Sequence, residues 1–108
     1  MALPLHPDAL EFAARLLLGE EFKRPLARLL GPHHPDGSRA TLDPRLPFRW
    51  LAPERLPNGD RNPAWRPIPP WVAPVLGRLL AERAEELEGQ AGMARRHSAV
   101  LLNWNEGE

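Results

Sequence analysis

Two adjacent histidines followed by a carboxylate have the spacing that comes nearest to a metal site. They are His33, His34 and Asp36, in the run Gly-Pro-His-His-Pro-Asp. Adjacent side chains in a proline turn seldom converge on one ion, and the other two histidines, His6 and His97, are remote in the sequence. The chain has no cysteine that could supply a thiolate. The sequence therefore predicts no metal ion and no cofactor.

The sequence also contains few candidate nucleophiles and few candidate acid–base pairs. Ser38 and Ser98 are the only serines, and neither lies in the Gly-x-Ser-x-Gly pattern of a nucleophile elbow. Glu82, Glu85 and Glu86 have the spacing of a solvated helical face rather than of a paired acid and base. No phosphate-binding loop, dinucleotide-binding glycine pattern or zinc-protease motif is present. We therefore expect a protein that is not an enzyme.

Arginine carries nearly all of the positive charge, with 13 residues against one lysine. Its planar guanidinium suits phosphates, base edges and carboxylates. Between residues 39 and 67 six arginines accompany three acids, an excess of three positive charges: Arg39, Arg45, Arg49, Arg55, Arg61 and Arg66 against Asp43, Glu54 and Asp60. The whole chain has a net charge of zero. This cluster either contacts nucleic-acid phosphates or forms a solvated surface paired with local acids, and both interpretations stay open.

The composition predicts an all-α fold. Leu occurs 19 times and Ala 14 times, whereas Val, Ile and Thr together occur five times and Tyr is absent, which leaves little to build a sheet. A length of 108 residues allows one small domain. No apolar run is long enough to span a membrane, and the first residues have neither a basic leader nor a signal-peptide core. We expect a soluble cytoplasmic protein.

Residues 1–31 have the pattern of two short helices. Asp8 is the expected N-cap of the first helix, with Glu11 at capping-box spacing and Gly19 at its end. The second is expected from about residue 20 to 30, where Gly31 and a following proline stop it. The apolar residues at helical spacing are Leu10, Ala13, Ala14, Leu17 and Leu18 in the first helix, and Phe22, Leu26, Leu29 and Leu30 in the second.

Residues 32–70 are rich in proline and irregular, yet three of the four tryptophans lie in or beside them, so we expect an ordered segment. One short helix is predicted within it, from an N-cap at Asp43 to about Ala52. Trp50 is expected to face inward, together with Leu46 and Leu51. We expect the tryptophans to fill the core and anchor the loops rather than to stack on bases.

The helix predicted with the strongest pattern runs over residues 70–88. Its apolar stripe comprises Val72, Val75, Leu76, Leu79, Leu80 and Leu87, with Ala84 between them. This stripe is expected to pack on the core of its own chain, with a partner helix as the alternative. Gly89 and Gly92 are expected to break or loosen the helix. The predicted domain therefore covers residues 1–92, and residues 93–108 form a packed tail or a dimerisation segment.

Three runs carry a resemblance to a known family. They are Phe22-Lys-Arg-Pro-Leu-Ala-Arg-Leu-Leu-Gly31, then Asp43-Pro-Arg-Leu-Pro-Phe-Arg-Trp-Leu-Ala52, then Arg66-Pro-Ile-Pro-Pro-Trp-Val72. Over residues 9–88 the chain resembles the lambda-repressor-like (Cro/C1-type) helix-turn-helix domain of small phage-type regulators. It departs from that family in two insertions, at about 31–43 and 53–65 around the expected recognition helix. The resemblance implies a modified helix-turn-helix whose second helix, about 43–52, lies in a major groove of DNA.

The function implied by this resemblance is a non-enzymatic, DNA-binding transcriptional regulator of phage or mobile-element type, acting on double-stranded DNA as a homodimer. Arg45 and Arg49 would enter the groove. The full set of expected DNA-binding residues is Arg39, Thr41, Arg45, Arg49, Arg55 and Arg66. The alternative is a protein-interaction module, or a small helical subunit or inhibitor, that binds a partner protein through the Pro/Arg/Trp-rich segment 32–70. The zero net charge and the enlarged turn favour this alternative.

Overall fold

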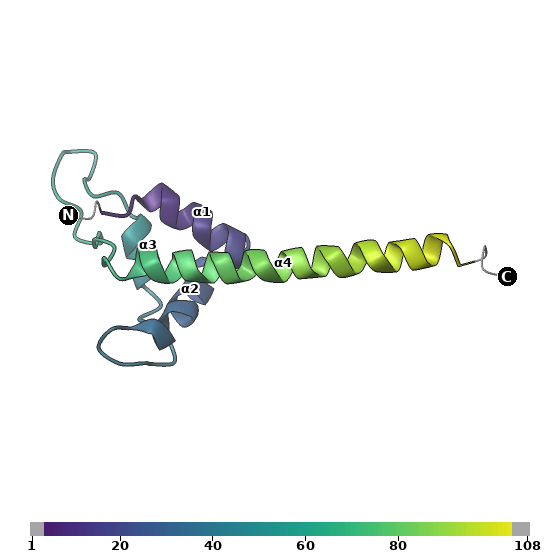
Figure 1. Cartoon of the computed structure of the whole chain (residues 1–108). Coiled ribbons are helices and arrows are strands. Elements are labelled where there is room, and N and C mark those ends of the chain that lie inside the picture. Colours follow the sequence, from purple (N-terminus) through teal and green to yellow (C-terminus); the bar gives the residue numbers. More distant parts are fainter. Residues whose placement is uncertain (1–3, 105–108) are drawn as a thin grey trace.

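Four α-helices and one short 3-10 helix make up the fold of residues 4–104, the part of the chain that the computed structural model describes. They are α1 (Pro7–Leu18), α2 (Lys23–Leu30), η1 (Gly31–His33), α3 (Leu46–Leu51) and α4 (Val72–Leu102) (Figure 1). No strand occurs in these residues, and a single isolated bridge joins Arg55 to Arg61. The all-α class predicted from the composition is confirmed.

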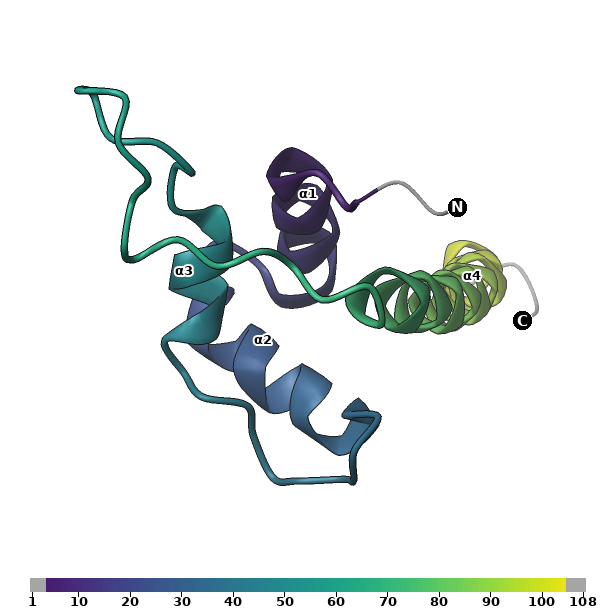
Figure 2. The ribbon, with the colours of Figure 1, turned by 90° about the vertical axis from the view of Figure 1, so that its left-hand side faces the viewer.

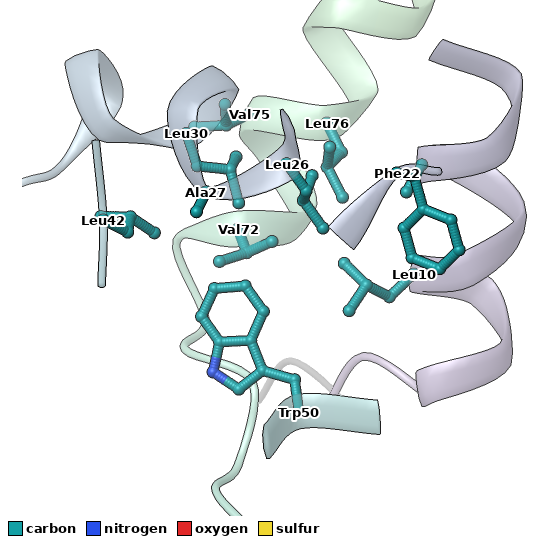
Figure 3. Packing of buried hydrophobic residues seen from close by; sticks show 11 residues of the cluster. Leu10, Phe22, Leu26, Ala27, Leu30, Leu42, Trp50, Val72, Val75 and Leu76 are labelled. Carbon is teal, nitrogen blue, oxygen red and sulfur yellow. The ribbon is translucent and has the colours of Figure 1, made fainter. Parts of the chain in front are cut away.

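One hydrophobic core joins α1, α2, α3 and the first two turns of α4. Trp50 of α3 lies beside Val72 of α4, with Leu10 of α1 next to them (Figure 3). The buried apolar residues are Leu10, Ala14, Phe22, Leu26, Ala27, Leu30, Leu42, Trp50, Val72, Val75 and Leu76. We call residues 4–83, which contain this core, the head.

The remaining part of α4 projects away from the head (Figure 1). A helix of 31 residues is about 46 Å long at about 1.5 Å per residue. The chain measures 74 Å in its longest dimension, and its radius of gyration is 19.9 Å against about 13 Å for a compact domain of this length. Beyond Arg83 almost every residue is exposed. We call residues 84–102 the arm.

The first two helices begin elsewhere than the sequence predicts. His6, not Asp8, is the N-cap of α1, because its Nδ1 accepts the Asp8 backbone N–H at 3.1 Å. Gly19 ends α1 as predicted, with φ at 85°. Helix α2 begins at Lys23, three residues later than expected. An earlier start would have placed Pro25 in the second turn, where its missing N–H removes a helical hydrogen bond.

Helix α3 is shorter than the predicted span of 43–52. Asp43 caps a turn instead of the helix: its Oδ1 accepts the Arg45 backbone N–H at 3.0 Å, and its carbonyl accepts that of Leu46 at 3.0 Å. The helix then begins at Leu46, which places the buried Pro47 in its first turn, where a missing N–H costs little. Trp50 is buried as predicted, whereas Leu46 and Leu51 are only partly covered.

The expected break at Gly89 and Gly92 is wrong, because α4 continues through both to Leu102. A glycine in a helix costs about 1 kcal/mol relative to alanine, and the alanines, arginines and methionine around it are good helix formers. Residues 93–102 are therefore helical, and they lie exposed rather than packed on their own chain. Residues 105–108 of the predicted tail lie outside the described part of the chain.

Candidate nucleic-acid interface

Helices α2 and α3 pack against each other and carry a group of positive charges. We call Lys23, Arg24 and Arg28 of α2, with Arg45 and Arg49 at the start and in the body of α3, the α2–α3 cations. The side chains of α2 line a shallow surface hollow together with Phe48 of α3, and the Lys23 Nζ lies 5.0 Å from the centroid of the Phe48 ring. Glu11, Glu20 and Glu21 line the same hollow, together with Arg15.

Arg24 and Arg28 are candidate site residues that the sequence analysis did not select. They are four residues apart on α2, so they lie on one face of that helix, and both are exposed. The available signal was the composition of α2, Lys-Arg-Pro-Leu-Ala-Arg-Leu-Leu, which contains three cations and no acid. The proximity of α2 to α3 makes these residues part of the same candidate interface.

Arg45, one of the two residues expected to read bases, is held by a neighbouring carboxylate. Its Nε donates to Asp43 Oδ1 at 3.2 Å and its terminal nitrogen donates to Oδ2 at 2.9 Å. The Arg45 guanidinium and the Arg45 backbone N–H together lower the pKa of Asp43 to about 2. Two of the five N–H donors of the guanidinium are thus occupied by Asp43, and a bidentate contact with a base edge through Nε would require this pair to open.

The pair between Asp43 and Arg45 predicts a titration that can be measured. The unfolded pKa of Asp43 is 3.8 and the folded pKa is about 2, so the stability from this pair is present above pH about 3.8 and is lost as the pH falls through about 2. In an NMR titration of the Asp43 carboxyl carbon, Arg45→Gln should raise the pKa toward 3.8. Arg55→Gln, which changes the same charge elsewhere, should leave that pKa unchanged; equal shifts in both variants would contradict the pairing.

Most of the other expected DNA-binding residues also have partners in the loops. Arg66 donates to the carbonyls of Pro63 and Trp65 at 2.9 and 2.8 Å. Arg39 Nε donates to the Gly37 carbonyl at 3.4 Å, and the Thr41 hydroxyl donates to the following carbonyl at 2.8 Å. Within residues 4–104, no side-chain hydrogen bond or ion pair engages Arg49 or Arg55.

The structure brings only part of the predicted set together. Arg45 and Arg49 lie one turn apart on α3, and the Arg66 backbone N–H donates to the Arg49 carbonyl at 3.2 Å. The loop that contains Arg39 and the loop that contains Arg55 leave α3 on opposite sides (Figures 1 and 2). The fold therefore does not place all six predicted residues on one flat surface.

The histidine run and the tryptophans have packing roles. His34 Nδ1 accepts the Asp36 backbone N–H at 3.1 Å, and its ring meets the Trp71 ring edge-on, with centroids 5.4 Å apart. Residues 4–104 contain no group of three histidines and carboxylates arranged to hold a metal ion. Trp50 fills the core as predicted, and the half-buried Trp65 stacks against Arg61.

The arm and the residue just after it carry six of the ten large apolar side chains that the described residues leave exposed. Their exposed fractions range from 48% to 78%. They are Leu87, Met93, Val100, Leu101 and Leu102 of the arm, with Trp104 just after it. In addition, the head has a partly open groove of about 740 Å³ beside α3, lined mainly by Leu5, Trp50, Leu51, Pro53, Trp65 and Ile68.

Comparisons with protein-family models, with curated proteins and with solved structures found no match for this chain. The resemblance to helix-turn-helix regulators therefore rests on the three runs within residues 22–72 alone. In the described part of the chain, no helix is both long enough and apolar enough to cross a membrane.

Proposed function

We propose that the head binds double-stranded DNA, as a non-enzymatic regulator of phage or mobile-element type. The observation that carries this proposal is the charge of α2 and α3. These two packed helices and the turn before α3 hold five cations and one acid, and that acid, Asp43, is already paired with Arg45. Arginines on two neighbouring helices, of which Arg24 and Arg28 are exposed and Arg49 is half-buried, attract the phosphates of a duplex and position it.

Phosphate contacts are proposed to dominate over base reading. Helix α3 has only six residues, and two of them, Pro47 and Trp50, are buried in the core. Of the two residues expected in the groove, Arg45 is engaged by Asp43, which leaves Arg49 with an unengaged guanidinium. We therefore assign the affinity to Arg24, Arg28 and Arg49, and expect weak discrimination between DNA sequences.

A fluorescence-anisotropy titration with a random duplex tests this proposal. Binding should weaken between about 50 and about 200 mM salt, and each phosphate contact removed should reduce the log–log slope by about 0.9. The double variant Arg24→Ala with Arg28→Ala should lose affinity and slope. The matched control, Arg61→Ala with Arg78→Ala, removes the same charge from exposed positions outside α2, α3 and the arm, and should bind like the unmodified protein. Absence of salt-sensitive binding, or equal losses in both variants, would overturn the proposal.

A protein-interaction module is the second candidate function, and the apolar groove beside α3 favours it. This groove lies against the Pro/Arg/Trp-rich segment and includes Trp65 and Ile68. Binding of a partner protein through such a surface buries apolar area and depends little on salt. The same salt series therefore separates the two functions.

A further inference from the structure

Uncharged residues follow one another from the last turn of α4 in the head to the end of the arm, at alternating intervals of four and three. They are Leu80, Ala84, Leu87, Ala91, Ala94, Ser98 and Leu101, which we call the seam. This spacing repeats every seven residues and is the pattern by which two helices pack in a coiled coil. The seam starts one turn after Leu76, the last buried residue of α4, and its residues Leu87 and Leu101 are 48% and 58% exposed. Within residues 4–104 the seam is exposed at every position except Leu80 and Ala91, which are half-buried.

The charges beside the seam differ between the two ends of the arm. Near the head, residues 82–88 contain four glutamates and one arginine. Near the tip, Arg95 and Arg96 are followed by His97, with no acid from residue 89 to 102. We propose that the arm pairs in antiparallel orientation with the arm of a second copy of this chain. This orientation places the acidic end of each arm against the basic end of the other, whereas a parallel pair would place like charges together.

The size of the seam residues and the flanking charges select one alignment. In that alignment Ala84 faces Leu101 of the partner subunit, and Leu87 faces the partner's Ser98. Each of these layers combines a large and a small residue, and the two central layers contain only alanine. Glu88, on the edge of the seam, then faces the partner's Arg95. A shift by one heptad would instead place Glu88 against its own copy, which is unfavourable.

The same alignment also covers the apolar tip of the arm. Leu102 and Trp104, whose exposed fractions are 78% and 68%, come to lie over Ala81 and Arg83 of the partner subunit, where that arm leaves its head. An indole ring beside an arginine is a favourable cation–π arrangement. The two heads lie at opposite ends of the paired arms. This inference is independent of DNA binding, since it uses none of the α2–α3 cations.

Disulfide cross-linking tests the orientation, because the chain has no cysteine of its own. Ala84→Cys and Leu101→Cys are made separately in the full chain, and helix content is checked by circular dichroism. A 1:1 mixture should form disulfide-linked dimers that contain one chain of each kind, and each variant alone should form few. Glu82→Cys, on the outer face of the arm, replaces Ala84→Cys in the control mixture and should cross-link poorly. Efficient linkage of each variant to itself, equal linkage in the control, or no linkage would overturn the proposal.

A charge exchange tests the alignment without touching the seam. Glu88→Arg alone and Arg95→Glu alone should each weaken the dimer by at least about threefold in sedimentation equilibrium, because each creates two like-charge contacts. The double variant should restore the dissociation constant of the unmodified protein. A double variant that is as weak as, or weaker than, the single variants would contradict the facing of Glu88 and Arg95.

Discussion

Trp50→Ala is expected to lower the free energy of unfolding of the head by about 3–5 kcal/mol. The indole is 1% exposed and is the largest side chain of the core. It joins α3 to Val72 of α4 and faces Leu10 of α1, so its loss leaves a cavity between three helices (Figure 3). Small domains have a total stability of about 5–15 kcal/mol, and a loss of this size leaves much of the head unfolded at moderate temperature.

Urea unfolding followed by circular dichroism measures this loss without relying on tryptophan fluorescence. The matched control is Trp104→Ala, which removes the same side chain from a position that is 68% exposed. At a protein concentration below that of any dimer, the control should change the free energy of unfolding by less than about 0.5 kcal/mol. Similar midpoints for the two variants would mean that α3 does not depend on Trp50 for its position.

The helices of the head could be predicted because their apolar residues recur at helical spacing. Leu10 and Ala14 on α1, and Leu26 and Leu30 on α2, are one turn apart and fully buried. The core face of each helix therefore follows from the local sequence. The starts of the helices do not, because they depend on single groups such as the His6 imidazole, which accepts the backbone N–H of Asp8 and so takes the N-cap position expected for Asp8.

The arm shows what local periodicity does not determine. The apolar stripe of α4 predicts a helix, but the pattern is the same whether the covering partner is the same chain or another one. Val72 and Leu76 are covered by the head, whereas Leu87, on the same predicted stripe, is half exposed. The residues covered by the same chain end at Leu76, where the core of the head ends. That boundary follows from the tertiary arrangement and not from the periodicity of the stripe.

The candidate interface was predicted only in part for a related reason. The excess of arginine marked residues 39–66 as a candidate surface, but the partners of each guanidinium depend on the loops. Arg66 stabilises its own loop through two carbonyls, and Arg45 is paired with an acid two residues before it. Arg24 and Arg28 join the interface because α2 packs on α3. The sequence of α2 shows its cations, but it does not indicate that packing.

Gly31→Ala is expected to destabilise the head by about 1–3 kcal/mol, or more, through a steric clash. The sequence predicts only that Gly31 stops the second helix, and its φ of −50° is a value that any residue adopts. The requirement is space: a Cβ at this position would lie 2.7 Å from the Thr41 Cα and 2.8 Å from the Arg39 carbonyl oxygen. Both are backbone atoms, so neither can rotate away.

The clash would separate a loop that is bonded to α2 at two points. The Arg39 N–H donates to the Gly31 carbonyl at 3.2 Å, and the Leu42 N–H donates to the Ala27 carbonyl at 3.0 Å. Leu42, which is 4% exposed, is part of the core. Gly31→Ala is therefore expected to weaken both hydrogen bonds and to expose Leu42. It would also displace the connection that leads to α3.

Gly77→Ala provides the matched control, because it makes the same chemical change in open space. Gly77 lies in α4, where a Cβ would have no neighbouring atom within 4 Å, so alanine should stabilise the helix by about 0.5–1 kcal/mol. Thermal unfolding of the two variants should therefore shift the midpoint in opposite directions. If Gly31→Ala raised the midpoint as Gly77→Ala does, the approach of residues 39–42 to α2 would be absent. Arg39 and Thr41 would then belong to a detached loop rather than to the surface of the head.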